Sequence, residues 1–178
     1  MRGQNNVQGA SDAGLIPMVF PDYQSVENKD IHSKYENFWK VELDNKKGLT
    51  VVEIVHKILE DEIKSMYIMG ENPAMSDPDQ NHAREALAKL DHLVVQDIFM
   101  TETAWHADVI LPSSAHAEKT GTFTNTNRQV QLGRQAVPPP GDARQDWWIT
   151  QAIAQRMGLD WSYLHPRDVF NEMAQVMP

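Results

Sequence analysis

Apolar residues recur at helical spacing over residues 51–63, directly after a polar start. Thr50 and Glu53 stand three residues apart, as the two partners of a capping box do. The apolar positions that follow fall on one helical face: Val51, Ile54, Val55, Ile58, Leu59 and Ile63. The pattern predicts an amphipathic helix whose apolar face belongs to the core.

Three short apolar runs follow this helix, at residues 66–69, 93–95 and 109–111. They show little polar alternation, which is typical of parallel strands that are covered on both faces. A segment that opens at Pro78 separates the first two runs, and Ala83, Leu87 and Leu90 share one face of it. Strand, helix and strand form a βαβ unit. The pattern therefore predicts an α/β fold: a three-layer, Rossmann-like domain with a mainly parallel sheet.

Ligand sites of such sheets lie at the carboxyl ends of the strands. The loop Gly70-Glu71-Asn72-Pro73 follows the first strand; it suits a diphosphate, because glycine allows close approach and amides at a helix start favour anionic oxygens. The alternative is an ordinary strand-to-helix turn. Gln96-Asp97 ends the second strand and can bond a ribose or a purine edge, or Asp97 is merely solvated and Thr101 caps the next helix.

The rest of the chain divides into segments with different expected roles. Residues 1–24 are rich in Gly, Asn and Pro and are expected to form a long active-site or cofactor loop, with a disordered terminus as the alternative. Residues 48–158 form the βαβ core, which ends in a helix that Asp142 caps and Gly158 terminates. Residues 159–178 add a helical segment. We therefore interpret residues 1–178 as a single ligand-binding domain.

Composition excludes several classes of function. The chain has 178 residues, a formal net charge of -9 and no cysteine. The negative charge argues against non-specific nucleic-acid binding, and without cysteine the chain holds no iron–sulfur cluster of its own. The seven histidines form no close ligand pair with a supporting carboxylate, so we expect no metal ligands in this chain. No signal peptide or run of about 18 apolar residues is present, which predicts a cytoplasmic protein without membrane insertion.

Six ordered blocks resemble the molybdopterin oxidoreductase family, and within it formate dehydrogenase catalytic subunits. The blocks are Arg-Gly-Gln-Asn-Asn-Val-Gln-Gly at 2–9, Met-Gly-Glu-Asn-Pro at 69–73, Gln-Asp-Ile-Phe-Met-Thr-Glu-Thr at 96–103, Ala-Asp-Val-Ile-Leu-Pro at 107–112, Glu-Lys-Thr-Gly-Thr-Phe-Thr-Asn at 118–125 and Arg-Gln-Val-Gln at 128–131. Together they span most of the chain. No single block is specific, but their order is.

The resemblance implies a cofactor and a role. Members of the family bind two molybdopterin guanine dinucleotides that chelate Mo or W, and formate dehydrogenases oxidise formate to carbon dioxide. This chain resembles the α/β domain that grips one dinucleotide. Five positions match cofactor contacts to phosphate, ribose or guanine: Asn72, Ser76, Gln96, Ser113 and Asp146. Among them, Asp146 matches a carboxylate that faces the guanine.

At the start of the chain, the resemblance implies catalytic residues. Arg2 matches an active-site arginine that holds formate, and Gln4 matches a polar neighbour. A guanidinium can bind a carboxylate substrate through two hydrogen bonds, although a solvated terminal arginine is the alternative. The metal ligand and the iron–sulfur cluster of the family lie outside these residues. The expected partners are therefore the remaining domains of the same subunit and electron-transfer subunits.

Two further readings remain open at this point. One keeps the family but changes the substrate, as in a nitrate reductase-type member; the other is a stand-alone nucleotide-binding or assembly module without catalysis. We expect the chain to be an excised or truncated part of a larger subunit and to be inactive alone. Surface that was once internal would then be exposed, so Trp105 and Trp161 are candidates for self-association.

Overall fold

The computed structural model describes residues 5–177, and Arg2 and Gln4 lie outside them. Contacts within the described chain group into two compact units. One, here called the sheet unit, comprises Thr50–Lys119 and Gln135–Trp161. The other, here called the hairpin unit, comprises residues 5–49, 120–134 and 162–177. The assignment of residues 1–178 to a single cofactor-binding domain stays a prediction, and each unit is described by itself.

A three-stranded parallel sheet forms the centre of the sheet unit. Its strands are β3 (Ser65–Met69), β4 (His92–Asp97) and β5 (Val109–Pro112), in the order β3-β4-β5. Each predicted apolar run forms one of these strands. The α/β class and the parallel pairing predicted from the sequence are therefore confirmed.

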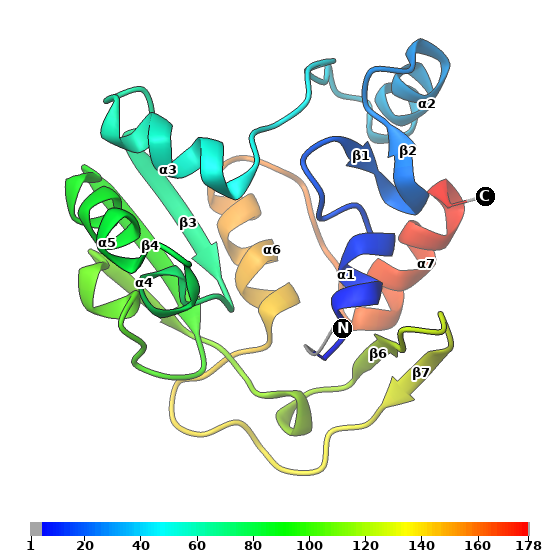
Figure 1. Cartoon of the computed structure of the whole chain (residues 1–178). Helices are drawn as coiled ribbons and strands as arrows, with labels where there is room; N and C mark the ends of the chain where they lie inside the picture. Colours follow the sequence, from blue (N-terminus) through cyan, green and yellow to red (C-terminus); the bar gives the residue numbers. More distant parts are fainter. Residues whose placement is uncertain (1–4, 178) are drawn as a thin grey trace. The chain divides into compact units, whose positions relative to one another are not determined.

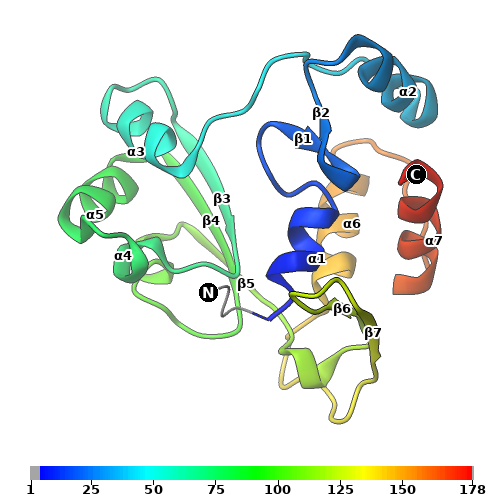
Figure 2. The ribbon, with the colours of Figure 1, turned by 45° about the vertical axis from the view of Figure 1, so that its right-hand side comes forward.

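Helices lie on both sides of this sheet (Figures 1 and 2). On one side are α3 (Val51–Leu59), α4 (Pro73–Ser76) and α5 (Gln80–Lys89), and on the other is α6 (Asp146–Arg156). Two 3-10 turns complete the unit, η2 (Ala104–His106) and η3 (His116–Glu118).

The predicted capping box at the start of α3 is present. Thr50 Oγ1 accepts from the Glu53 amide at 3.4 Å, and Glu53 Oε2 accepts from the Thr50 amide at 2.7 Å. The helix ends at Leu59, four residues earlier than predicted, because the chain turns back at Asp61, whose φ is +64°. The Ile63 amide then donates to Lys57 O at 3.2 Å instead of extending the helix.

One face of the sheet carries the core. The buried side chains of this cluster come from the strands and from α4, α5 and η2: Ile68, Ala74, Leu87, Leu93, Val95 and Ala104. The covering of the strands is less complete than predicted, since the side chains of Tyr67, Val109 and Ile110 are each about 40% exposed. Because β3 and β5 are the edge strands of the sheet, their side chains have a strand neighbour on one side only.

The start of α6 also differs from the prediction. Asp142 is almost fully exposed and does not cap the helix, which begins at Asp146 with Gln145 as its N-cap. The intervening chain is held extended, because the Arg144 amide donates to Pro112 O at 3.1 Å and Arg144 O accepts from the Ser114 amide at 2.9 Å. This pairing with the end of β5 delays the helix and fixes the position of Asp146.

The hairpin unit contains short elements from three parts of the chain. Its helices are α1 (Val7–Asp12), η1 (Pro21–Tyr23), α2 (Lys29–Trp39) and α7 (Pro166–Val176). Its strands form two antiparallel hairpins, β1 (Val19–Phe20) with β2 (Gln24–Ser25), and β6 (Gly121–Thr124) with β7 (Val130–Gly133). The helical segment predicted for residues 159–178 contains α7, which begins at Pro166.

The segment that was predicted to be a long loop is not one in its described part. It contains α1, which is stabilised by side-chain hydrogen bonds one turn apart. Gln8 Nε2 donates to Asp12 Oδ1 at 2.7 Å, and Ser11 Oγ donates to Val7 O at 2.9 Å. These local bonds offset the poor helix propensity that the glycine and asparagine content suggested.

Tyr35 is the fully buried centre of the hairpin unit. Its ring stacks on Phe20, with 4.3 Å between the centroids, and its hydroxyl accepts from Gln24 Nε2 at 2.8 Å. Val176 O, at the end of α7, accepts from Lys34 Nζ at 2.7 Å. These contacts join α2, the first hairpin and α7. Burial raises the pKa of the Tyr35 hydroxyl above its usual value.

Candidate functional site

The carboxyl ends of β3 and β4 meet at Gly70. Its amide donates to Gln96 O at 2.9 Å, which continues the parallel pairing one residue past β3. The φ of Gly70 is +64°, a backbone conformation that residues other than glycine rarely adopt. A Cβ at this position would meet no atom within 4 Å, so open space lies beside the backbone. This is the geometry that lets a ligand approach the main chain closely.

Gln96 and Asp146, both predicted as site residues, are in direct contact. Gln96 Nε2 donates to Asp146 Oδ1 at 2.8 Å. Lys119 Nζ donates to the other oxygen, Asp146 Oδ2, and also to Ser114 O at 3.1 Å. Residues from β4, from the segment after η3 and from α6 therefore meet at one carboxylate.

A tyrosine on the neighbouring strand completes this network. The Tyr67 hydroxyl donates to Gln96 Oε1, so both ends of the Gln96 amide are engaged within the chain. Gln96 is fully buried, whereas about a third of the Asp146 side chain is exposed. Burial, with a smaller contribution from the negative charge of Asp146, raises the pKa of the Tyr67 hydroxyl and keeps it a donor.

Asn72 joins the loop after β3 to the loop after β4. Its Oδ1 accepts from the Thr103 amide at 3.1 Å and from the Thr103 hydroxyl at 2.8 Å. Its Nδ2 donates to Glu102 Oε2 at 2.7 Å, and this hydrogen bond is the main cause that lowers the pKa of Glu102. Asn72 thus holds the two strand-end loops together.

The diphosphate cradle predicted at the start of α4 is not formed as expected. Pro73, the first residue of the helix, has no N–H. The Ala74 amide donates to Thr103 Oγ1 at 3.0 Å, and the Met75 and Ser76 amides donate to Asn72 O at 3.0 and 2.8 Å. The amides of this short helix are therefore engaged within the chain. Ser76, the last residue of this helix, is exposed.

Ser113 and Ser114 follow β5 and are both buried. The Ser113 amide donates to Asp97 O at 3.0 Å, which brings the ends of β5 and β4 together. Ser114 is 1% exposed, and no described residue hydrogen-bonds to its hydroxyl oxygen. Ser113 also pairs with Arg144, two residues before Asp146. Ser113 therefore lies beside the Gln96 and Asp146 network, whereas the hydrogen bonds of Asn72 and Ser76 go to other residues.

Three residues of this site were not predicted from the sequence: Tyr67, Thr103 and Lys119. Lys119 is paired with a carboxylate 27 positions away, and no spacing within one helix or strand indicates such a pair. Tyr67 contacts Gln96 and Thr103 contacts Asn72, but both pairs are distant in the sequence and are brought together only by the fold. Within residues 5–177, no group of three or more His, Asp or Glu residues could hold a metal ion.

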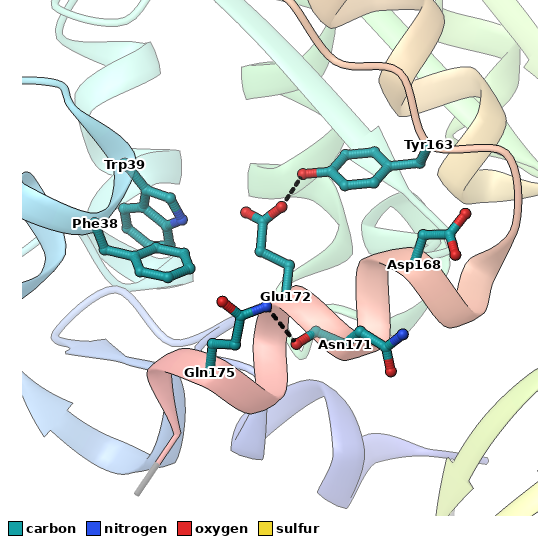
Figure 3. A pocket seen from close by; sticks show the side chains of 7 residues that line it. All are labelled: Phe38, Trp39, Tyr163, Asp168, Asn171, Glu172 and Gln175. Carbon is teal, nitrogen blue, oxygen red and sulfur yellow. Dashed lines mark hydrogen bonds between the residues drawn. The ribbon is translucent and has the colours of Figure 1, made fainter.

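The hairpin unit contains a separate cavity between α2 and α7 (Figure 3). It has a volume of about 450 Å³, with Phe38 and Trp39 on one side and Asp168 and Glu172 on the other. Tyr163 donates a hydrogen bond to Glu172, and burial followed by this bond raises the pKa of Tyr163 to about 12.

Comparison with known proteins places the chain in a family. A model of the family described as molybdopterin oxidoreductase matches residues 2–156. The chain belongs to the molybdopterin oxidoreductase family. The resemblance that the six sequence blocks indicated is thereby confirmed.

Relatives of this molybdopterin oxidoreductase chain are much longer than the chain itself. The putative formate dehydrogenase YrhE of Bacillus subtilis is 48% identical over 178 residues, which is all of this chain and 18% of the relative. A formate dehydrogenase subunit alpha of Methanocaldococcus jannaschii is 52% identical over 180 aligned residues, which cover all of this chain and 26% of the relative. Among solved structures, acetylene hydratase from Pelobacter acetylenicus superposes with a TM-score of 0.55 at 26% identity, over 61% of this chain and 16% of that one.

The family implies a molybdopterin cofactor, and the sheet unit contains groups that a ligand can reach. Asp146 offers a partly exposed carboxylate to hydrogen-bond donors, and Gly70 leaves open space beside a strand end. Lys119 lies beside the carboxylate and places a positive charge there. In a chain whose net charge is -9, such a local charge can attract an anionic group of a ligand. None of the helices within residues 5–177 has the length and apolar character that a membrane span requires.

Proposed function

We propose that this chain forms the part of a formate dehydrogenase catalytic subunit that binds and orients one molybdopterin guanine dinucleotide. The observation that carries the proposal is the Asp146 carboxylate, held at the carboxyl end of a parallel strand by Gln96 and Lys119. Formate dehydrogenases at 48% and 52% identity support the choice of reaction. The intact subunit would oxidise formate to carbon dioxide, with Mo or W bound through other residues.

Guanine suits this carboxylate because its edge presents two neighbouring N–H groups, from the ring and from the exocyclic amine. An ionised carboxylate only accepts hydrogen bonds, so it pairs with guanine and repels the acceptor nitrogen at the same place on adenine. Charge-assisted bonds of this kind are stronger than neutral ones. Asp146 would therefore select the base, while Ser113 and Ser76 would lie toward the ribose and the phosphates.

The bound metal and pterin would supply the redox chemistry, taking up the two electrons that formate releases. The contribution of this chain would be to bind and to orient. Arg2, which lies outside the described residues, would hold the formate carboxylate with its guanidinium, and Gln4 would be its polar neighbour. We further propose that the remaining domains of the subunit and electron-transfer subunits are its partners.

Nucleotide titration tests the binding role. We expect the chain to bind GMP more tightly than AMP in calorimetry, and Asp146→Asn to remove most of that preference. Asp142→Asn is a matched control, because Asp142 is exposed and lies four residues before Asp146. Equal affinity for GMP and AMP in the unaltered chain would contradict the proposal.

A second measurement tests the reaction. In the intact subunit with its cofactor, formate-dependent dye reduction is expected, and Arg2→Lys should weaken formate binding because an ammonium cannot form the paired contact of a guanidinium. An intact subunit that reduces dye with another substrate but not with formate would contradict the assignment of the substrate.

A further inference from the structure

The Asp146 carboxylate is held on both of its oxygens by residues from different elements. Gln96 Nε2 donates to Oδ1, and Lys119 Nζ donates to Oδ2. Each of these donors is itself fixed: Lys119 also donates to Ser114 O, and Gln96 Oε1 accepts from the Tyr67 hydroxyl. The orientation of the carboxylate is therefore determined by three separate segments of the sheet unit.

This arrangement leaves Asp146 with a defined capacity for a ligand. An ionised carboxylate has about four acceptor positions, two on each oxygen. Gln96 and Lys119 occupy one on each oxygen, so one on each remains. That is the number that the two N–H groups of a guanine edge require. Asp146 is about one-third exposed whereas Gln96 is fully buried, so a ligand can reach the carboxylate but not the Gln96 amide.

We infer that Lys119 is a positioning residue for guanine recognition and that Gln96, steadied by Tyr67, is its counterpart on the other oxygen. This inference rests on the proposed function. Without Lys119 only one oxygen of Asp146 is anchored, and the carboxylate can turn about its terminal bond. The plane of the carboxylate then no longer matches the plane of the base, and the second hydrogen bond to guanine weakens.

Comparison of GMP with IMP isolates this effect. Hypoxanthine lacks the exocyclic amine of guanine but keeps the ring N–H, so the affinity ratio of the two nucleotides reports the second hydrogen bond alone. The positive charge of Lys119 also attracts the phosphate, but it does so equally for both nucleotides. A change in the ratio is therefore a readout that loss of charge or a modest loss of stability does not produce.

The experiment is calorimetric titration of the full chain with GMP and IMP. The unaltered chain is expected to favour GMP about tenfold or more, as the loss of one charge-assisted hydrogen bond predicts. Lys119→Met keeps the length of the aliphatic stem and should reduce the ratio to about twofold or less. Lys119→Arg, which can still donate to Oδ2, should retain most of the preference.

A double variant shows whether Lys119 acts through Asp146. In the Asp146→Asn background the preference for GMP is already lost, so adding Lys119→Met should leave the ratio unchanged. If Lys119→Met does not fold, the same comparison is made with Lys119→Gln, with folding checked by circular dichroism.

Two outcomes separate the inference from the proposed function. If the chain prefers GMP and Lys119→Met and Lys119→Gln retain the full ratio, the positioning role is wrong while guanine recognition by Asp146 stands. If the unaltered chain shows no preference between GMP and IMP or AMP, the proposed function and this inference both fall.

Discussion

Asn72 Oδ1 accepts two hydrogen bonds from Thr103, one from the amide at 3.1 Å and one from the hydroxyl at 2.8 Å. The same hydroxyl accepts from the amide of Ala74 at 3.0 Å. Thr103 is fully buried, and it joins the loops that follow two neighbouring strands. The Thr103 hydroxyl therefore links both loops, beside the amide contact to the same Asn72 oxygen.

Thr103→Val tests this hydroxyl, because valine has nearly the same shape and cannot hydrogen-bond. The substitution leaves the buried Ala74 amide without its acceptor, and we expect a loss of about 1–3 kcal/mol in the free energy of unfolding. Urea denaturation followed by circular dichroism measures it. Thr103→Ser, which keeps the hydroxyl, is the matched control, and a valine variant as stable as the serine variant would refute the bridging role.

The core beneath the sheet leads to a second stability prediction. Leu93 is 1% exposed and packs in the buried cluster of the sheet unit, so Leu93→Ala is expected to cost about 2–5 kcal/mol in the free energy of unfolding. Ile98 follows the same strand and is 47% exposed. Ile98→Ala should change stability by less than about 0.5 kcal/mol. Equal losses for the two variants in urea denaturation would show that this face is not the core.

The sheet was predictable because its strands are short apolar runs set between polar loops. The same reasoning missed the hairpin of β6 and β7, whose strands have four residues each and contain only three large apolar side chains, Phe123, Val130 and Leu132. It also left out α2, although Asn28 is a good N-cap residue and accepts from the Asp30 and Ile31 amides at its start. The apolar pattern thus identified the strands of the sheet and α3, but it did not reveal α2, which is marked by its N-cap, or the short strands of the hairpin.

Some residues of the candidate site could likewise be predicted from the sequence, and others could not. Gln96 and Asp146 could be named because Gln96 ends a predicted strand and Asp146 matches a carboxylate position of the family. Lys119 stood within a quoted sequence block, but nothing in the linear pattern pairs it with a carboxylate 27 residues later. The start of α6 was misplaced for a related reason, since pairing of Arg144 with the end of β5 keeps the chain extended before Asp146.

Tyr163 provides a prediction on pH dependence in the hairpin unit. Burial, followed by the hydrogen bond to Glu172, raises its pKa from an ordinary value of 10.0 to about 12. A raised pKa means that folding favours the protonated hydroxyl. Its contribution to stability is therefore complete below pH 10 and is lost as the pH rises through about 12.

Ultraviolet titration of phenolate absorbance measures this pKa directly. The difference between the chain and Tyr163→Phe should show a phenolate that forms near pH 12. Glu172→Gln removes the negative charge and should lower the pKa of Tyr163, though not to its ordinary value, because burial remains. Titration of Tyr163 at its ordinary pKa in the unaltered chain would mean that neither the burial of its hydroxyl nor the contact with Glu172 drawn in Figure 3 persists in solution.

The loop after β4 exposes a group of large apolar side chains. Phe99 is 74% exposed and Trp105 is 75% exposed, and Met100 between them is 51% exposed. Contiguous exposed apolar surface promotes association. We expect sedimentation velocity to show concentration-dependent association of the chain. The double variant Phe99→Lys with Trp105→Lys should weaken that association by about tenfold or more, because it removes two large apolar contacts and adds like charges.

Leu164→Lys is the control, since Leu164 is 88% exposed but lies in the hairpin unit, and it should leave association unchanged. A monodisperse monomer at all concentrations would contradict the prediction, and so would a double variant that associates like the unaltered chain.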